Sequence, residues 1–179
     1  MNRLSLDLME LMGTSLGLKD EKYYRKFFED GCAIFRCNYY PPCKQPDRAL
    51  GTGPHRDPTA LTILHQDGVS GLEVFTQGIW RTVRPYPGSF VINLGDLFVP
   101  MSEGKYNSCL HRAVLNKDTV RKSLVFFIFS RKDKLIVPPE ELVSGDSRNY
   151  PEFTWSDYQK FVVSKYRLLL LPKRRWSRS

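Results

Sequence analysis

Short runs of alternating side chains, separated by turn residues, recur along the chain from Ala33 to Phe129. The runs are rich in β-branched and aromatic residues, and Gly, Pro or Asp stands between them. They cover residues 33–40, 59–65, 72–75, 79–83, 89–94, 110–115 and 121–129. Many short strands with frequent turns are typical of an antiparallel sandwich or barrel. The sequence therefore predicts a mainly β fold, with a double-stranded β-helix, or jelly roll, as the natural candidate.

Segments with helical periodicity flank this β-rich region. Apolar residues recur at helical spacing near the start of the chain, at Leu4, Leu8, Leu11 and Met12. Gly13, followed by Gly17, is expected to interrupt this first helix. A second, aromatic-rich helix is expected to begin after Asp20, which can cap it, and to end at Gly31. With a last helix over residues 157–166, we predict a jelly roll with flanking N-terminal and C-terminal helices.

The triplet His55-Arg56-Asp57 and a distant histidine, His111, form a candidate metal site. Two neutral imidazoles and one carboxylate can hold a single Fe(II) on one triangular face and leave its other coordination positions open. If the chain is extended from Gly53, His55 and Asp57 point to the same side of a strand, so both can reach one metal. His111 would then come from a distant strand. These three residues are the predicted metal ligands and, through the metal, the predicted catalytic residues.

A second His-x-Asp, formed by His65 and Asp67, competes with the first. It follows an apolar run and precedes a glycine, which is typical of a strand that ends in a tight turn. The first pair instead follows a glycine-rich loop and opens an apolar run, where a pocket rim could present it. A His-x-Asp by itself is a weak motif. The interpretation of the first pair therefore depends on the other residues that accompany it.

One such group is Arg121-Lys122-Ser123, ten residues beyond His111. Arg121 and Ser123 share one face of a predicted strand, and a guanidinium with a neighbouring hydroxyl suits the far carboxylate of a dicarboxylic acid. Arg121 could also be a surface arginine at the entry to a strand. A buried arginine that faces phenylalanines, by contrast, would need a carboxylate partner. A dicarboxylate co-substrate would supply that partner.

The first predicted strand places Arg36, Asn38 and Tyr40 on one side. Three polar side chains on one face of a small barrel suggest that they converge on a pocket. Tyr40 stands beside two prolines, and a tyrosine in that setting is more often a packed turn residue than a ligand. Arg36 and Asn38 are weaker candidates on the residues alone.

Several motifs carry a resemblance to a known family. In order they are Asn38-Tyr39-Tyr40-Pro41-Pro42-Cys43, Gly53-Pro54-His55-Arg56-Asp57-Pro58, Leu110-His111-Arg112 and Arg121-Lys122-Ser123. Together they resemble the plant 2-oxoglutarate and Fe(II)-dependent dioxygenases. Within that family, residues 61–67, 109–114 and 150–155 are most similar to the gibberellin 20-oxidases. The resemblance runs from about Leu4 to Arg167 and looks like the C-terminal half of such an enzyme, with an atypical tail after it.

The resemblance implies Fe(II) as the metal, 2-oxoglutarate and O₂ as co-substrates, and ascorbate as a reductant. The implied iron ligands are again His55, Asp57 and His111. The residues implied to bind 2-oxoglutarate are Arg121, Ser123, Tyr40 and Asn38.

The implied reaction is the oxidation of a gibberellin precursor at carbon 20, in the biosynthesis of that plant hormone. Two alternatives stay open. One is a related plant dioxygenase that acts on a flavonoid or another small molecule. The other is a truncated, non-catalytic product, because barrel strands without neighbours expose edges and apolar faces.

Composition adds few constraints. The formal charge of +8 arises mainly from basic residues after Ser164, which are Lys165, Arg167, Lys173, Arg174, Arg175 and Arg178. A basic tail is usually a solvated end, so we expect no specific nucleic-acid partner. No C-x-x-C spacing, export signal or membrane-length apolar run is present, which favours reduced thiols and a cytoplasmic protein. We also expect a monomer, and the resemblance implies a small-molecule substrate. We expect a helical lead-in at 1–32, a jelly-roll core at 33–148, a C-terminal helical segment at 149–167 and a disordered basic tail at 168–179.

Overall fold

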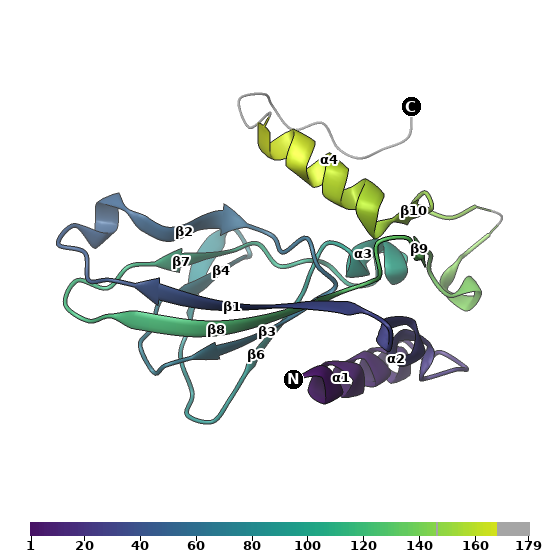
Figure 1. Ribbon diagram of the computed structural model, residues 1–179, viewed down its shortest axis with the longest axis horizontal. Helices are drawn as coiled ribbons and strands as arrows, with labels where there is room; N and C mark the ends of the chain where they lie inside the picture. Colours follow the sequence, from purple (N-terminus) through teal and green to yellow (C-terminus); the bar gives the residue numbers. More distant parts are fainter. Residues whose placement is uncertain (146, 168–179) are drawn as a thin grey trace.

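Two four-stranded antiparallel sheets face each other in the computed structural model, which describes residues 1–145 and 147–167 (Figure 1). Sheet A has the order β1-β8-β3-β6 and sheet B the order β2-β7-β4-β5. A two-stranded sheet, β9 with β10, lies beside them. This is the jelly roll that the alternating runs predicted, so the predicted fold class is confirmed. The expected tail at 168–179 lies outside the described residues.

Sheet A consists of β1 (Cys32–Tyr40), β8 (Arg121–Phe129), β3 (Leu61–Gln66) and β6 (Val91–Leu94). Sheet B consists of β2 (Leu50–His55), β7 (His111–Val114), β4 (Leu72–Thr76) and β5 (Ile79–Val83). The small sheet is formed by β9 (Leu135–Ile136) and β10 (Phe153–Thr154). The helices are α1 (Asn2–Ser15), α2 (Tyr23–Phe28), α3 (Phe98–Met101) and α4 (Trp155–Arg167), with short 3-10 turns at Pro46–Arg48 and Glu140–Leu142. None of these described helices is long and apolar enough to cross a membrane.

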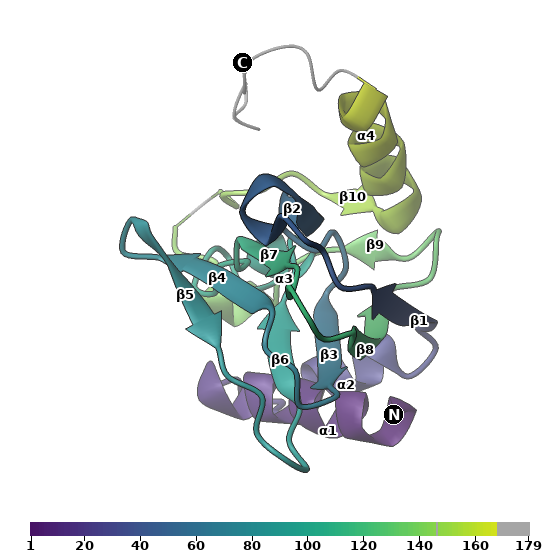
Figure 2. The ribbon, with the colours of Figure 1, turned by 90° about the vertical axis from the view of Figure 1, so that its left-hand side faces the viewer.

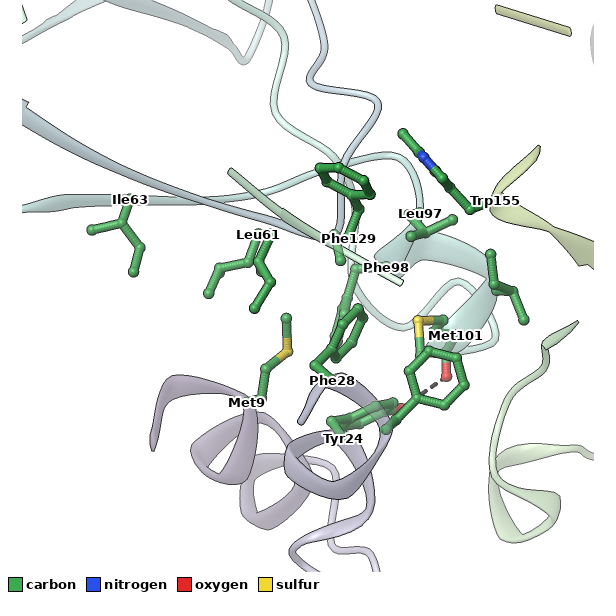
Figure 3. Close-up of a cluster of buried hydrophobic side chains, with 14 of the residues drawn as sticks. Met9, Tyr24, Phe28, Leu61, Ile63, Leu97, Phe98, Met101, Phe129 and Trp155 are labelled. Atoms are coloured by element: carbon green, nitrogen blue, oxygen red, sulfur yellow. Dashed lines mark hydrogen bonds between the residues drawn. The ribbon is translucent and has the colours of Figure 1, made fainter. Parts of the chain in front are cut away.

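The main hydrophobic core lies on the outer face of sheet A, where α1 and α2 cover it (Figure 2). Met9 of α1 and Phe28 of α2 point toward Leu61 and Ile63 of β3 (Figure 3). All four side chains are almost completely buried. The hydroxyl of Tyr24 donates a hydrogen bond of 2.8 Å to the carbonyl oxygen of Met101, which satisfies the one polar group of that ring. Apolar burial at this face is therefore the main stabilising feature of the fold.

The rest of this outer face is not covered by helices. Phe35, Phe90 and Leu124 lie there with 57%, 45% and 43% of their surface exposed. Together with Met1, they line a groove on this face. We refer to these three residues and their groove as the uncovered apolar face. A contiguous apolar patch of this kind is typical of a surface that contacts another molecule or segment.

The expected helix boundaries were wrong at both ends of the chain. Helix α1 continues through Gly13. The backbone of Glu21 lies so close to this position that a Cβ there would collide with it. That glycine permits close packing and does not end the helix. Leu11, one of the residues of the predicted apolar helical pattern, is 58% exposed and does not belong to the core. Helix α2 has no side-chain cap, and Asp20 instead pairs with Lys26.

Helix α4 begins two residues earlier than the sequence predicted. Thr154 and Asp157 form a reciprocal cap, since the Asp157 carboxylate accepts from the Thr154 N–H at 3.1 Å and the Thr154 hydroxyl accepts from the Asp157 N–H at 3.2 Å. This is the capping-box arrangement with an aspartate in place of glutamate. Asp157 is therefore the third residue of the helix and not its first residue, as was expected.

Candidate metal centre and adjoining cavities

Strand pairing in sheet B brings the two predicted histidine ligands together. His55 is the last residue of β2 and His111 the first residue of β7, and the antiparallel register pairs them directly. Their ring centroids lie 4.3 Å apart. Asp57 follows on the loop between β2 and β3, so the extended segment that was expected to carry both His55 and Asp57 ends at the histidine. The two residues still reach one point, since Asp57 is buried and its carboxylate lies beside both histidines.

Three ligand atoms converge at this point. The Nε2 atom of His55 lies 3.6 Å from Oδ1 of Asp57, and the Nε2 atom of His111 lies 3.7 Å from the same oxygen. All three atoms lie within 4.8 Å of one another, which is a spacing that one metal ion can bridge. A triangle of two imidazoles and one carboxylate is the geometry of non-haem Fe(II) oxygenase sites.

Neighbouring groups orient each candidate ligand. Nδ1 of His55 lies 2.8 Å from the Gly53 carbonyl oxygen, and Nδ1 of His111 lies 3.0 Å from that of Cys109. A proton on each Nδ1 leaves Nε2 free as the metal-binding atom. The hydroxyl of Thr62 donates to Oδ2 of Asp57 at 2.6 Å, which leaves Oδ1 free toward the histidines. Each of the three candidate metal-binding side chains is therefore held in its orientation by a hydrogen bond at the atom that does not face the metal site.

The electrostatics of this cluster favour a carboxylate and a cation. Burial opposes the ionisation of Asp57, but hydrogen bonds from His55 and Thr62 and the nearby His111 outweigh it and hold its pKa below the ordinary value. The hydrogen bond to Asp57 raises the pKa of His55, although burial works in the opposite direction. A metal ion at this point would take the place of the proton on His55.

The competing pair lies elsewhere. His65 points to the outer face of sheet A, where its ring meets Phe90 at a centroid distance of 6.0 Å. The Asp67 carboxylate accepts a hydrogen bond from the backbone N–H of Lys122. Neither residue belongs to the cluster of His55, Asp57 and His111, which matches the preference given to the first pair.

Arg121 is the largest of the fully buried side chains, with 1% of its surface exposed. It donates a hydrogen bond of 3.0 Å to the Gln66 side chain, and its guanidinium lies 5.2 Å from the centre of the Tyr40 ring. Its Nε atom is buried without a hydrogen-bond partner, and no carboxylate in the described part of the chain pairs with it. Burial lowers its pKa below the usual value. A buried guanidinium without an acidic partner fits the carboxylate of a ligand.

The structure brings the other predicted co-substrate residues to the same place. Asn38 donates a hydrogen bond of 3.2 Å to the hydroxyl of Ser123, and the Tyr40 hydroxyl lies 3.2 Å from that of Thr52. With Arg121 and the three metal-ligand candidates, these residues line one small cavity of about 50 Å³ between the sheets, which we call the inner cavity. The polar face predicted for the first strand therefore does converge on a pocket.

Sequence reasoning missed four residues that shape this site. Thr62 orients Asp57, and Gln66 holds Arg121. Gly71 leaves room for that arginine, since a Cβ there would lie 2.6 Å from Arg121 Cδ. Asn93 pairs with Thr62 across the sheet and turns a buried, unpartnered Nδ2 into the inner cavity. No motif marks these positions, and only the alternation within β3, which places Thr62 and Gln66 on one face, could have suggested them.

A jelly roll that holds this triangle beside a buried arginine defines a non-haem Fe(II) oxygenase domain. Consistently, a family model described as the 2OG-Fe(II) oxygenase superfamily matches residues 31–130. The chain belongs to the 2OG-Fe(II) oxygenase superfamily. Fe(II) and 2-oxoglutarate are the metal and co-substrate of this family, as the resemblance of the motifs implied.

Individual relatives agree with this family. The chain is 65% identical over 170 residues to gibberellin 20 oxidase 5 of Arabidopsis thaliana, covering 94% of this chain and 44% of that protein. It is 54% identical over 167 residues to gibberellin 20 oxidase 2 of Oryza sativa subsp. japonica, with coverages of 93% and 42%. The chain therefore spans less than half the length of these curated relatives.

Solved structures show the same fold. A crystal structure of JOX2 in complex with 2OG, Fe and JA matches with a TM-score of 0.84 and 41% identity, covering 89% of this chain and 48% of that one. A crystal structure of the rice dioxygenase for auxin oxidation matches with a TM-score of 0.83 and 34% identity, covering 93% and 56%.

Proposed function

We propose that this chain is the metal-binding half of a 2-oxoglutarate-dependent dioxygenase that oxidises a gibberellin precursor at carbon 20. The proposal rests on the similarity to gibberellin 20 oxidases over nearly the whole chain. These relatives are more than twice as long as the matched part, so the reaction of the whole enzyme stays a proposal for this chain. Similarity to a protein in complex with JA and to a dioxygenase for auxin oxidation keeps another small-molecule substrate open.

In the proposed mechanism His55, Asp57 and His111 hold Fe(II) through Nε2, Oδ1 and Nε2. When bound, Fe(II) with 2-oxoglutarate and O₂ would supply the oxidation of an unactivated carbon, with release of succinate and CO₂ and with ascorbate as a reductant. The chain's own residues bind the metal and hold the metal-binding side chains in position. Thr62 holds the unused oxygen of Asp57, and the carbonyl groups of Gly53 and Cys109 fix the histidine tautomers.

A second set of residues is proposed to hold 2-oxoglutarate in the inner cavity: Arg121, Ser123, Tyr40 and Asn38. The guanidinium of Arg121 can make two parallel hydrogen bonds to the distal carboxylate, and the Ser123 hydroxyl can add a third. The single observation that carries this proposal is the burial of Arg121 without an acidic partner, on the same cavity as the three metal-ligand candidates.

The test is anaerobic addition of Fe(II) and then 2-oxoglutarate to the purified 179-residue chain. We expect a weak visible charge-transfer band that requires both additions. His65→Ala is the matched control, because His65 lies on the outer face of sheet A, and it should keep the band. A band that survives in His111→Ala, or that is absent from the unaltered chain at saturating ligand, would contradict the proposal.

The uncovered apolar face supports a second candidate, a non-catalytic product that acts only as a binding partner. Phe35, Phe90 and Leu124 would be exposed in such a protein, and β1 is a long edge strand with one free side. Mass spectrometry of products separates the candidates. We expect weak or no turnover of gibberellin precursors by the chain alone, and turnover when the front half of a gibberellin 20 oxidase is fused before Met1. No turnover by either protein, despite bound metal, would favour the non-catalytic candidate.

A cytoplasmic location and a monomeric state remain part of the proposal. Sedimentation of the purified chain and imaging of a fluorescent fusion in plant cells test them.

A further inference from the structure

Helix α3 and the start of α4 lie near each other beside β10 (Figure 1), and a cavity of about 260 Å³ opens between them. The residues that line it are Asp96, Val99, Pro100, Tyr150, Phe153, Tyr158 and Phe161. None of them lines the inner cavity. A well-packed protein interior leaves few voids larger than a water molecule. Packing of the hydrophobic core therefore does not explain this cavity.

Four of the lining residues are aromatic, so we call this cavity the aromatic pocket. The ring centroid of Tyr158 lies 5.9 Å from that of Phe153 and 6.4 Å from that of Phe161. The planes of Tyr158 and Phe161 differ by 27°, and those of Tyr158 and Phe153 by 47°. Phe153 is buried, whereas the other three rings are only half-buried. The faces of such rings carry negative electrostatic potential, which favours a cation.

Asp96 adds a carboxylate to the same pocket. Its Oδ2 atom accepts a hydrogen bond of 3.0 Å from the hydroxyl of Tyr158, and its backbone N–H donates to the carbonyl oxygen of Asp57 at 2.7 Å. These two contacts hold the residue in place. Aspartates elsewhere on the surface pair with lysine or arginine. The described residues that line the pocket include no lysine, arginine or histidine, so Asp96 meets no countercharge there.

The chemistry of the pocket distinguishes three kinds of ligand. A neutral apolar ligand would remove water from the Asp96 carboxylate without replacing it by a countercharge, which is unfavourable. A primary ammonium is strongly hydrated and brings three N–H donors, most of which would face rings that cannot accept a normal hydrogen bond. A quaternary ammonium has no N–H donor, and its methyl groups place the positive charge directly against the ring faces.

We propose that the aromatic pocket binds a quaternary ammonium group, with the ring faces around its methyl groups and the Asp96 carboxylate as its counterion. The volume of the pocket is slightly below the about 300–1,000 Å³ of sites for drug-sized molecules, so it fits a compact group. This binding site goes beyond the proposed dioxygenase function. The group belongs either to a small molecule such as choline or to a trimethylated lysine side chain.

The test compares the binding of three probes of similar size to the 179-residue chain. Choline carries the quaternary ammonium group. The alcohol 3,3-dimethylbutan-1-ol has the same shape without the charge, and ethanolamine has a primary ammonium instead. NMR titrations give each Kd. We expect choline to bind on the order of ten-fold more tightly than either of the other two, as a desolvated cation on aromatic faces predicts.

Asp96→Asn should weaken choline and leave the neutral alcohol unchanged. Asparagine keeps the shape of the side chain and can still accept from the Tyr158 hydroxyl, but it lacks the charge. Binding of the alcohol thus reports that the pocket is intact. The matched control is Asp47→Asn, because Asp47 is an exposed aspartate of the 3-10 turn and does not line the pocket.

Phe161→Leu is a second, independent variant. It removes one ring face but keeps an apolar side chain, so it should weaken choline more than the alcohol. The matched control is Phe75→Leu, since Phe75 of β4 is partly exposed and does not line the pocket. Circular dichroism shows whether each variant is folded.

A short peptide with one trimethyllysine distinguishes the two sources of the group. Tighter binding of the peptide than of choline would identify a protein side chain, and weaker binding would identify a small molecule. The inference is overturned if choline shows no saturable binding, if the alcohol or ethanolamine binds as tightly as choline, or if both variants retain full choline affinity. None of these results bears on the dioxygenase proposal, because the aromatic pocket shares no lining residue with the inner cavity.

Discussion

The two faces of sheet A are built from alternate residues of the same strands, yet they differ in chemistry. The outer face carries Leu61 and Ile63 under the helices α1 and α2, and it is apolar. The inner face carries Thr62, Arg121 and Ser123, all nearly or completely buried. Burial of apolar groups stabilises a fold, whereas burial of a charge without a charged partner destabilises it.

This difference separates stability from function within one sheet. The outer face supplies the favourable free energy of folding. The inner face holds the guanidinium of Arg121 and an unpaired amide, the Nδ2 of Asn93, that no folding requirement explains. Such groups are retained where a ligand completes their contacts. The following predictions test this division between the two faces.

The largest effect is expected at the metal-ligand cluster. His55→Ala, Asp57→Ala and His111→Ala should each abolish binding of one equivalent of metal, because each removes one of three converging ligand atoms. His65→Ala, on the outer face, should retain it. Metal analysis after gel filtration measures the stoichiometry. Retention of metal in the His55 variant with loss in the His65 variant would reverse the assignment.

The next largest effect is expected on the outer face. Leu61→Ala should lower the free energy of unfolding by about 2–5 kcal/mol, because a fully buried side chain leaves a cavity under the helices. Leu124→Ala, on the uncovered apolar face of the same sheet, should change it by less than about 0.5 kcal/mol. Urea denaturation compares the two variants. Equal losses would mean that the chain covers Leu124 in solution, for example by self-association.

Arg121 should behave in the opposite way to Leu61. Arg121→Met should leave the free energy of unfolding unchanged or raise it by about 1 kcal/mol, because it removes a buried charge that has no acidic partner. It should weaken 2-oxoglutarate binding strongly while metal binding persists. Arg121→Lys should weaken 2-oxoglutarate by about ten-fold or more, since one ammonium cannot reproduce the two-point contact. Unchanged affinity in either variant would leave Arg121 a structural residue.

The smallest effect concerns pH. In the metal-free chain the raised pKa of His55 contributes stability that is fully present below the ordinary value of 6.5 and is lost as the pH rises through the higher folded-state value. Metal binding has the opposite dependence, because the metal must displace the proton. The rise in melting temperature on addition of Mn(II) should therefore be larger at pH 8 than at pH 6. A rise that is independent of pH would show that His55 is not a ligand.

Much of the fold and part of the site could be predicted from local patterns. Strands β1 and β3 to β8 followed from alternation, and the cluster followed from the spacing of His55 and Asp57 with a later histidine. Strand β2 was missed because residues 50–55 contain two glycines and a proline, which normally mark a loop. Its pairing with β7 depends on contacts with a segment far along the chain. The periodicity of a short stretch of sequence carries no information about such contacts.

Positions that act through another residue were also missed. Thr62, Gln66 and Asn93 are ordinary strand residues in the sequence, and their roles arise only from their neighbours across the sheet. Gly13 and Gly71 show the same limit. A glycine is needed at each position because another part of the chain approaches it closely. In the sequence alone, such a glycine looks the same as one that ends a helix or a strand.

The sequence by itself determined the alternation that makes a two-layered β fold, the identities of the candidate ligands and the basic character of the end of the chain. These properties are local, because the direction of a side chain on a strand depends only on its position along the strand. The tertiary structure decided that His55 and His111 meet across sheet B, that Arg121 is buried without an acid, and that Asp96 shares a cavity with aromatic rings of β10 and α4. These properties depend on register and on burial, which are set by contacts between segments distant in the chain.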